Sequence, residues 1–355
     1  MNFNHSMNTR RSFLLQCSIA PLCSAAQIGA RSYPDGRPAA VLRLDATDAG
    51  PIIRHGEGPA HCDYLGAREA ICFRFKGTYY LHYDGAGPTG WRACLAVSRD
   101  LRHWDLRGPV LDLGEPGQDD AGTASSPWTV CDGKWWHMFY VGSRTTSPPP
   151  NRIPAVPYFT LAAKSRRPDG PWIKQPDVVP FRTKPGTYYA DTASPGQIVK
   201  QGDEYLMFFS AAAYINDPKR RLLRTLSIAR TKDLNGTWEI DPQPALPQEH
   251  QIENSALYFE PSNRTWFLFT NHIGLADQGE YTESIWVYWS PDLNHWNPDQ
   301  RAVVLDRSQR SIGMPSVVPV GRRLALFYDA SATDTRNMGR DIGLAWLKLP
   351  LNPPH

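Results

Sequence analysis

Ser98-Arg-Asp-Leu-Arg-His-Trp104 is a phrase that returns three times along the chain. Its other copies are Ser165-Arg-Arg-Pro-Asp-Gly-Pro-Trp172, Thr231-Lys-Asp-Leu-Asn-Gly-Thr-Trp238 and Ser290-Pro-Asp-Leu-Asn-His-Trp296. The tryptophans are 68, 66 and 58 positions apart (104 to 172, 172 to 238, 238 to 296). A period of this length indicates one supersecondary unit that is used several times.

A strand-like run precedes each phrase, and a fifth run lacks the Trp phrase but is followed by Asp341-Ile-Gly-Leu-Ala-Trp346. The five runs are Ile71–Tyr83, Trp128–Val141, Gln197–Ser210, Leu257–Thr270 and Ser316–Asp329. Their alternating residues suit a sheet packed on both faces, and the Asp-Leu-x-x-Trp segment suits a turn that leads into an outer strand. We therefore expect an all-β fold, a five-bladed β-propeller, because radial repetition leaves only short protected edges. A pair of β-sandwiches or a right-handed β-helix would have shorter or less regular repeats.

Composition agrees with many short strands. The 355 residues include 12 Trp, 15 Tyr and 13 Phe together with 32 Pro and 27 Gly, which suits strands joined by turns better than long helices. The formal net charge is only +3, so we expect no nucleic-acid partner. No apolar run after the N-terminal segment is long enough to span a bilayer. We expect one soluble domain over residues 31–350, with no membrane partner.

The first 30 residues predict an export signal. Thr9-Arg-Arg-Ser-Phe-Leu-Leu15 resembles the twin-arginine motif, and a moderately apolar stretch rich in small residues follows it. A disordered tail with a chance Arg pair is the alternative. We expect residues 1–30 to be removed and the mature protein to be periplasmic or secreted.

Four cysteines lie outside this signal: Cys62, Cys72, Cys94 and Cys131. They lack the close paired spacing of a zinc site. The sequence allows buried thiols or one or two disulfides.

Acidic side chains precede the strand-like runs. They are Asp63 and Glu69 before the first run, Asp119 and Asp120 before the second, Asp191 before the third and Glu253 before the fourth, whereas the fifth run offers Arg310. In a propeller the inner strands meet at the axis, so these side chains would face one funnel. Glycoside hydrolysis needs one carboxylic acid and one carboxylate, and neighbouring carboxyl groups push their pKa values apart. Alternatively, each acid caps a turn by accepting backbone N–H groups.

The order Asp63, Asp191-Thr-Ala-Ser-Pro-Gly196 and Ile252-Glu-Asn-Ser255 resembles the five-bladed glycoside hydrolases of family 43 and their relatives in family 117. The resemblance implies that Glu253 is the general acid. It implies that Asp191 tunes the pKa of the acid, with Asp120 as a rival. The usual Asp-Pro of the first strand is absent and Arg68-Glu-Ala70 stands there, so Asp63 and Glu69 are both candidates for the base.

The same resemblance implies an inverting, exo-acting hydrolase for a terminal arabinofuranosyl or xylosyl residue. Inversion predicts base and acid carboxyl groups roughly 6.5–9.5 Å apart. No cofactor is required, although a structural calcium near a central His is compatible with the family.

Further side chains are candidates for substrate contacts: Arg68, Trp128, His272 and Arg310, with Trp91 as another aromatic residue that could stack on a sugar ring. Trp residues at such positions also pack between blades, and His272 could make a structural hydrogen bond. Two other functions remain open. One is a non-catalytic glycan-binding propeller. The other is a glycoside phosphorylase, which would need basic residues in the funnel, and Arg68 and Arg310 could supply them.

Overall fold

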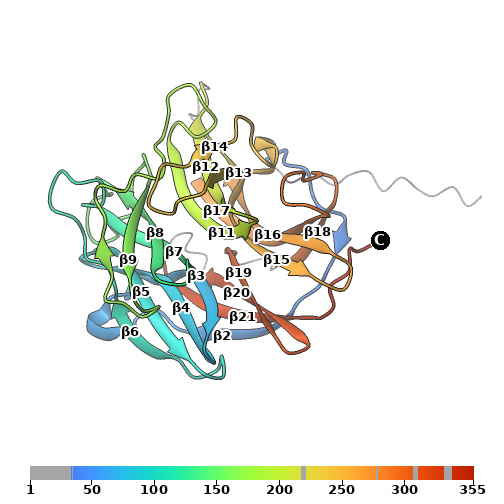
Figure 1. The fold of residues 1–355 in the computed structure, drawn as a ribbon, viewed down its shortest axis with the longest axis horizontal. Coiled ribbons are helices and arrows are strands. Elements are labelled where there is room, and N and C mark those ends of the chain that lie inside the picture. The colour runs from blue at the N-terminus through green and yellow to red at the C-terminus, as the bar shows by residue number, and fades with distance from the viewer. Residues whose placement is uncertain (1–32, 34, 217–220, 277–278, 307–310, 332–337) are drawn as a thin grey trace, which may run out of the picture.

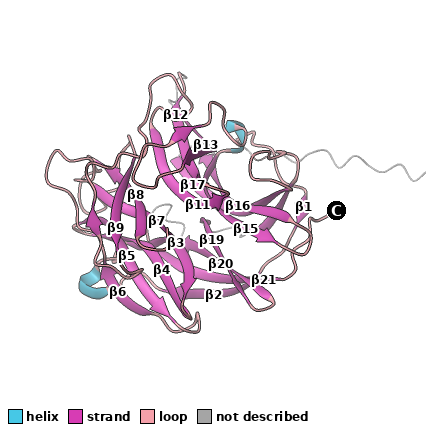
Figure 2. Cartoon of the chain, in the orientation of Figure 1, coloured by secondary structure: helices cyan, strands magenta, loops and turns pink. Residues whose placement is uncertain are grey.

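A computed structural model describes residues 33, 35–216, 221–276, 279–306, 311–331 and 338–355. The signal peptide predicted for residues 1–30 and the candidate Arg310 lie outside these residues. The described chain is almost entirely β-strand (Figure 2). Its two helices are short 3-10 turns, η1 (Pro59–His61) and η2 (Gln248–His250). No helix in this part of the chain has the length and apolar character needed to cross a bilayer.

The strands form successive antiparallel units, each of which winds outward from a first strand (Figure 1). Unit 1 consists of β3 (Gly66–Phe75), β4 (Thr78–Gly87), β5 (Gly90–Ser98) and β6 (Asp105–Pro109). Unit 2 consists of β7 (Thr123–Cys131), β8 (Trp136–Ser143), β9 (Phe159–Ser165) and β10 (Ile173–Lys174). A short parallel pairing of β5 with β7 joins these two units into one hydrogen-bonded sheet.

Units 3 and 4 are separate sheets. Unit 3 consists of β11 (Thr192–Gln201), β12 (Glu204–Tyr214), β13 (Leu222–Thr231) and β14 (Glu239–Ile240). Unit 4 consists of β15 (Ile252–Glu260), β16 (Thr265–Ala276), β17 (Gly279–Ser290) and β18 (Arg301–Asp306). The N-terminal strand β1 (Leu42–Arg43) adds to unit 4 in parallel with β18.

Unit 5 combines both ends of the described chain. Its strands β19 (Ile312–Val320), β20 (Arg323–Ser331) and β21 (Arg340–Lys348) come from the C-terminal part. Its outermost strand is β2 (Thr47–Ile53), which pairs antiparallel with β21. The first strands of consecutive units contact one another, β3 with β7, β7 with β11, β11 with β15 and β15 with β19, and β19 also contacts β3. Figure 1 shows all of them near the middle of the molecule.

The repeated Trp phrase forms the turn into the outermost strand, as predicted. In unit 1 the Ser98 hydroxyl accepts hydrogen bonds from the backbone N–H groups of Asp100 and Leu101. The Trp104 indole donates to the Leu101 carbonyl, and β6 follows at once. In unit 4 Trp296 donates in the same way to Leu293. The phrase therefore recurs because each unit needs the same turn.

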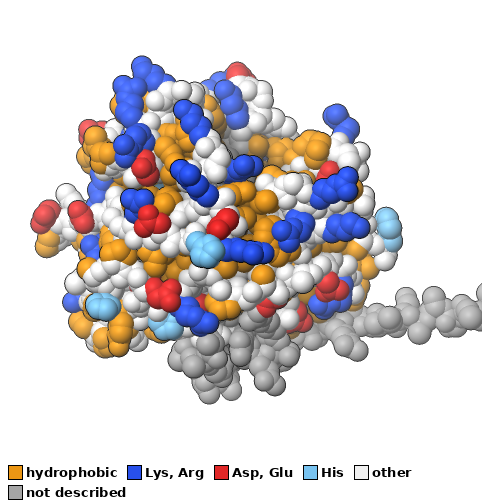
Figure 3. All heavy atoms as spheres, turned by 90° about the horizontal axis from the view of Figure 1, so that it is seen from below, with side chains coloured by type: hydrophobic (Ala, Val, Ile, Leu, Met, Phe, Trp, Pro, Cys, Tyr) orange, Lys and Arg blue, Asp and Glu red, His pale blue; other side chains and the backbone are white. Residues whose placement is uncertain are grey.

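The core lies between the faces of neighbouring units. Leu81 and Tyr83 of unit 1 pack with Phe327 and Leu344 of unit 5, and other buried clusters join units 3 and 4 in the same manner. Packing on both faces explains why the inner strands are rich in large apolar residues. On the outer surface seen in Figure 3, Lys and Arg side chains are scattered among apolar, uncharged and acidic ones.

Candidate functional site

Each of the five first strands has a break in its pairing register at the same place. The breaks lie between Arg68 and Ile71, Ser125 and Trp128, Ser194 and Gln197, Ile252 and Ser255, and Gly313 and Ser316. Such a β-bulge adds a residue to one strand and turns its side chain in a new direction. Glu69, Ser126 and Met314 adopt left-handed backbone angles there, with φ of 52°, 48° and 58°. Non-glycine residues with positive φ are costly and cluster at functional sites.

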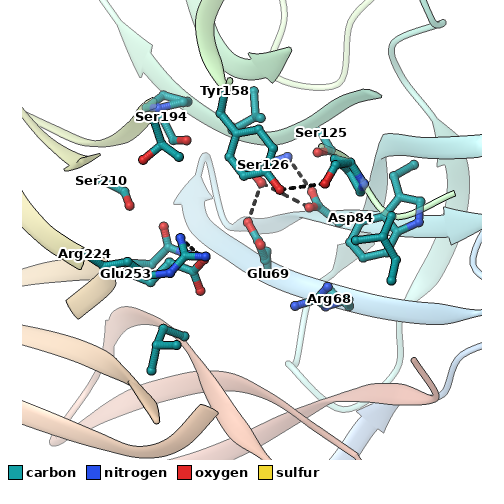
Figure 4. Close-up of a pocket in the computed structure, with 18 residues that line it drawn as sticks. Arg68, Glu69, Asp84, Ser125, Ser126, Tyr158, Ser194, Ser210, Arg224 and Glu253 are labelled. Carbon is teal, nitrogen blue, oxygen red and sulfur yellow. Dashed lines mark hydrogen bonds and ion pairs between the residues drawn. The ribbon is translucent and has the colours of Figure 1, made fainter. Parts of the chain in front are cut away.

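The bulges of units 1 to 4 border one cavity of about 180 Å³. Its polar side chains come from units 1 to 4, and several are labelled in Figure 4. The charged and hydroxyl-bearing lining residues are Arg68, Glu69, Asp84, Ser125, Ser126, Tyr158, Thr192, Ser194, Ser210, Arg224 and Glu253. Glu69 and Glu253 stand at equivalent bulge positions of units 1 and 4, so the repeat itself delivers two carboxyl groups to one cavity.

Ser126 joins Glu69 to a second carboxyl group, Asp84 of β4. The Ser126 hydroxyl hydrogen-bonds to Glu69 Oε2 and lies 3.1 Å from Asp84 Oδ2, and the Ser126 backbone N–H donates to Asp84 Oδ1. A hydroxyl has one hydrogen, so it can donate to only one of the two carboxylates. Both contacts are favourable when one carboxyl carries a proton and donates it to Ser126 Oγ.

Burial favours this protonated state. It raises the pKa of Glu69 well above its usual range, and the neighbouring Asp84 carboxylate raises it further. Burial also raises the pKa of Asp84, to about 7, although hydrogen bonds from Ser126 and the Arg68 charge oppose the increase. The Glu69 side of the cavity therefore holds a proton near neutral pH.

Glu253 has different surroundings. Its Oε1 lies 3.1 Å from Nη1 of Arg224, a largely buried residue of β13. Figure 4 shows this ion pair across the cavity from the contacts that link Glu69, Ser126 and Asp84. The guanidinium stabilises the charged carboxylate and fixes its direction. The cavity thus combines a proton-bearing carboxyl with an ion-paired carboxylate.

Arg68 is a second arginine in the wall. Its guanidinium covers the Trp91 ring, 4.9 Å from the centroid, so one face of that ring is already occupied. Its Nε lies 3.8 Å from Asp329 Oδ2, too far for a hydrogen bond, and has no hydrogen-bond partner among the described residues. Asp329 is instead held by Arg340, at 2.6 Å. Arg68 thus lines the cavity with its side chain, while its Nε is buried behind that wall.

Three predicted site residues meet here: Glu69, Glu253 and Arg68. Asp63 does not line the cavity. It is buried and accepts hydrogen bonds from the backbone of Gly56 and Gly58 and from the Tyr83 hydroxyl. Its contacts are those of a loop cap, the alternative that its sequence position also allowed.

Asp120 and Asp191 are also absent from the lining residues. Asp120 accepts from the Tyr140 hydroxyl at 2.9 Å and pairs with Lys174 at 2.6 Å, in a different pocket. Asp191 precedes β11 and accepts from the backbone N–H of Tyr214 at 2.8 Å. The carboxyl group that approaches a catalytic candidate is Asp84, which comes from a second strand.

Trp91, a candidate for stacking, lines the cavity, whereas the other two ring-bearing candidates lie outside the lining. Trp128 is buried in β7. His272 is buried in β16, donates from Nδ1 to the His250 carbonyl at 2.7 Å and lies against Trp286. Burial lowers the pKa of His272 well below its usual range, so the ring is neutral. Both side chains are buried away from the cavity in this structure.

The His272 ring offers no unused nitrogen to a metal ion. Both of its ring nitrogens are used within the protein, since Nε2 also lies 3.1 Å from the Thr270 hydroxyl. No three His, Cys, Asp or Glu side chains are grouped to hold a metal ion within the described ranges.

Several solved structures are similar in fold to this chain. No family model matches the sequence. A family 117 glycoside hydrolase from Zobellia galactanivorans is similar in structure, with a TM-score of 0.60 and 14% identity. The alignment covers 87% of this chain and 93% of the hydrolase chain. For the α-L-arabinanase of Cellvibrio cellulosa the alignment covers 78% of this chain and 90% of the arabinanase chain, with a TM-score of 0.56 and 14% identity. For a thermostable family-43 glycoside hydrolase the alignment covers 85% of this chain and 99% of the hydrolase chain, with a TM-score of 0.57 and 14% identity.

The chain has the fold of the family 43 and family 117 glycoside hydrolases. This confirms, in the fold, the resemblance expected from the sequence. Among curated proteins, a 1,2-beta-oligomannan phosphorylase from Thermoanaerobacter sp. is 28% identical over 102 aligned positions. That alignment spans 21% of this chain and 34% of the phosphorylase, so the chain matches about a third of that relative's length.

Proposed function

We propose that this chain is a glycosidase and that its five units are the blades of a propeller. The observation that carries the proposal is the cavity itself, in which equivalent bulges of units 1 and 4 present Glu69 and Glu253. Two carboxyl groups in unlike environments are the minimum that glycoside hydrolysis requires. The fold shared with family 43 and family 117 enzymes supports the same activity.

The surroundings suggest which carboxyl does what. Glu69 has its pKa raised by burial and by Asp84, so it holds a proton that it can donate to the glycosidic oxygen. Glu253, fixed by Arg224, is suited to remove a proton from the attacking water. This assignment exchanges the roles that the family resemblance implies, in which Glu253 is the acid.

The cavity size favours a terminal sugar. An engineered protein cavity of about 150 Å³ binds benzene, so 180 Å³ has room for one six-membered or five-membered ring. The hydroxyl groups of Ser125, Thr192, Ser194 and Ser210 line it and match the hydroxyl groups of a sugar.

We propose exo-acting, inverting cleavage of an arabinofuranosyl or xylosyl residue from a carbohydrate. The α-L-arabinanase with the same fold, solved in complex with arabinohexaose, supports the arabinosyl part of this proposal. Export through the twin-arginine segment would place the enzyme with extracellular glycans.

Aryl glycosides and plant oligosaccharides test the proposal. Glu69→Gln and Glu253→Gln should each lower turnover of a natural oligosaccharide by about 10³-fold or more, with unchanged circular dichroism. Glu239→Gln is the matched control, since Glu239 is exposed on β14, away from the cavity. If no sugar is released from any substrate while oligosaccharide still binds, the protein is a glycan-binding propeller instead. Product anomer analysis by NMR decides between inversion and retention.

Phosphorolysis is a second candidate, favoured by the two arginines in the cavity wall. Arg68 and Arg224 both line the cavity. Arginine suits phosphate because its donors match the geometry of the anion. The partial similarity to an oligomannan phosphorylase supports this candidate.

Phosphate dependence distinguishes the two candidates. A phosphorylase would release a sugar 1-phosphate and would be inactive in phosphate-free buffer. A hydrolase would release free sugar at the same rate with and without phosphate. Arg68→Met should abolish only a phosphate-dependent reaction, whereas substitution of the exposed Arg43 should change neither.

A further inference from the structure

Two of the four cysteines in the described chain have their sulfur atoms in contact. Cys62 follows η1 and Cys94 lies in β5, and their Sγ atoms are 3.6 Å apart. Both are free thiols and both are buried, at 3% and 0% exposure. Cys72 lies buried in β3 and Cys131 lies exposed at the end of β7. The sequence left the pairing of these cysteines open.

Two glycines of β4 create the space for this contact. A Cβ on Gly85 would lie 2.6 Å from Cys94 Sγ and 2.7 Å from the Cys62 carbonyl oxygen. A Cβ on Gly87 would also lie 2.7 Å from that oxygen. The segment that carries Cys62 can therefore lie directly on β4 beside Cys94, and any larger residue at these positions would push it away.

Cys62 lies in the segment that connects unit 5 to unit 1. Residues 54–65 connect β2, the outer strand of unit 5, to β3, the first strand of unit 1. At the start of this connection, the His55 backbone N–H donates to Asp341 Oδ1 of β21 at 2.9 Å. At its end, Cys62 meets Cys94 of unit 1. The connection thus spans the joint between the last unit and the first.

We propose that Cys62 and Cys94 form a disulfide in the exported protein and that this bond fastens the joint between units 5 and 1. The proposal is independent of the glycosidase activity. It uses the twin-arginine export prediction only for the compartment, because disulfides persist in oxidising compartments outside the cytoplasm.

The oxidant is the disulfide of a thiol–disulfide oxidoreductase, or of oxidised glutathione in vitro. The Cys62 thiolate attacks one sulfur of that disulfide and forms a mixed disulfide, releasing the first oxidant thiolate. The Cys94 thiolate then attacks Cys62 Sγ and displaces the second. Two protein thiols and one oxidant disulfide become one protein disulfide and two oxidant thiols. The hydrogen bond from Cys94 lowers the pKa of Cys62, which favours its thiolate.

The geometry needs only a small movement. A disulfide bond is about 2.05 Å long, so the sulfur atoms must approach from 3.6 Å. Cys62 lies in a short connection outside the strands, which can shift more easily than β5 can. The oxidant reaches the thiols when residues 54–65 lift from β4, or before they pack during folding.

Peptide mapping tests the bond directly. The full chain is incubated with oxidised glutathione, unfolded in the presence of N-ethylmaleimide and digested with trypsin without reduction. We expect residues 55–68 joined to residues 93–99, with Cys72 and Cys131 alkylated. Recovery of Cys62 and Cys94 as alkylated thiols, or joined to other cysteines, would overturn the proposal.

Stability gives a second measure. Reduction of the oxidised protein should lower its Tm by roughly 5 °C, because the bond closes a loop of about 30 residues. Cys94→Ala should abolish this response to reductant, and Cys72→Ala, another buried cysteine, should retain it. An equal response in the Cys94→Ala variant would show that a different bond is responsible.

Discussion

The two carboxyl groups of the cavity stand on the same backbone feature but have neighbours of opposite charge. Glu69 and Glu253 both stand at first-strand bulges, one in unit 1 and one in unit 4. Glu69 faces another carboxyl group, Asp84, through the Ser126 hydroxyl, whereas Glu253 faces the guanidinium of Arg224. The repeat fixes where a carboxyl group is placed, and residues on neighbouring strands decide whether it faces a second carboxyl group or a cation.

The sharpest test of this comparison varies the leaving group. With an aryl glycoside whose phenol is strongly acidic, Glu69→Gln should keep activity within about 10-fold of wild type, because such a phenolate leaves without a proton. Glu253→Gln should lose about 10³-fold or more on the same substrate, because water still needs a base. Steady-state kcat values across a series of phenols measure the contrast. The opposite pattern would restore Glu253 as the acid.

Removing the cation should damage the Glu253 end alone. Arg224→Met leaves the Glu253 carboxylate without its ion-pair partner, and we expect kcat/KM to fall by about 10²-fold. Arg224→Lys should recover part of this loss, since it restores the charge but not the planar fork. Arg230→Met serves as a control, because Arg230 pairs with Asp241 on the outer part of the same unit. Equal losses in both arginine variants would argue against a specific role for Arg224.

The carboxyl pair predicts a change in the pH profile. Asp84 raises the pKa of Glu69, so Asp84→Asn removes a negative charge and should lower that pKa. Because the acid must be protonated, the alkaline limb of kcat/KM against pH should move to lower pH. Ser126→Ala keeps the charge of Asp84 and should move the limb less. An unmoved limb in Asp84→Asn would mean that Glu69 is not the group that titrates there.

The smallest effect concerns stability. The pKa of Asp84 is raised to about 7 in the folded protein from 3.8, so the folded state binds more protons between these values. Stability from this group is present below pH 3.8 and is lost as pH rises through about 7. Asp84→Asn does not titrate, and its loss of unfolding free energy between pH 5 and 8 should be smaller by about 2–3 kcal/mol. Urea unfolding at both pH values measures the difference.

The sequence predicted the strands and turns well for a physical reason. Each unit must make the same turn before its outer strand, so Ser98, Trp104 and their counterparts leave a repeated phrase. The predicted runs begin about five residues into the first strands because the polar residues before each bulge, such as Ser125 and Ser194, hide the start of the strand.

The lining of the cavity was only partly predictable from the sequence. Glu69, Glu253 and Arg68 could be found because they open first strands. Asp84 and Arg224 could not, since they lie in second and third strands and only the folded arrangement brings them to the cavity. Asp63 was predicted to face the same cavity but lies outside its lining, because an acid before a strand can equally cap a loop, here at Gly56 and Gly58.

The origin of β2 sets an order of events during synthesis. Residues 47–53 leave the ribosome early, yet their hydrogen-bonding partner, β21, lies at residues 340–348. β2 therefore has no strand to pair with until almost the whole polypeptide has been made. A chain stopped by a premature termination codon before β21 would therefore expose an unpaired N-terminal strand, which is a natural target for proteolytic quality control.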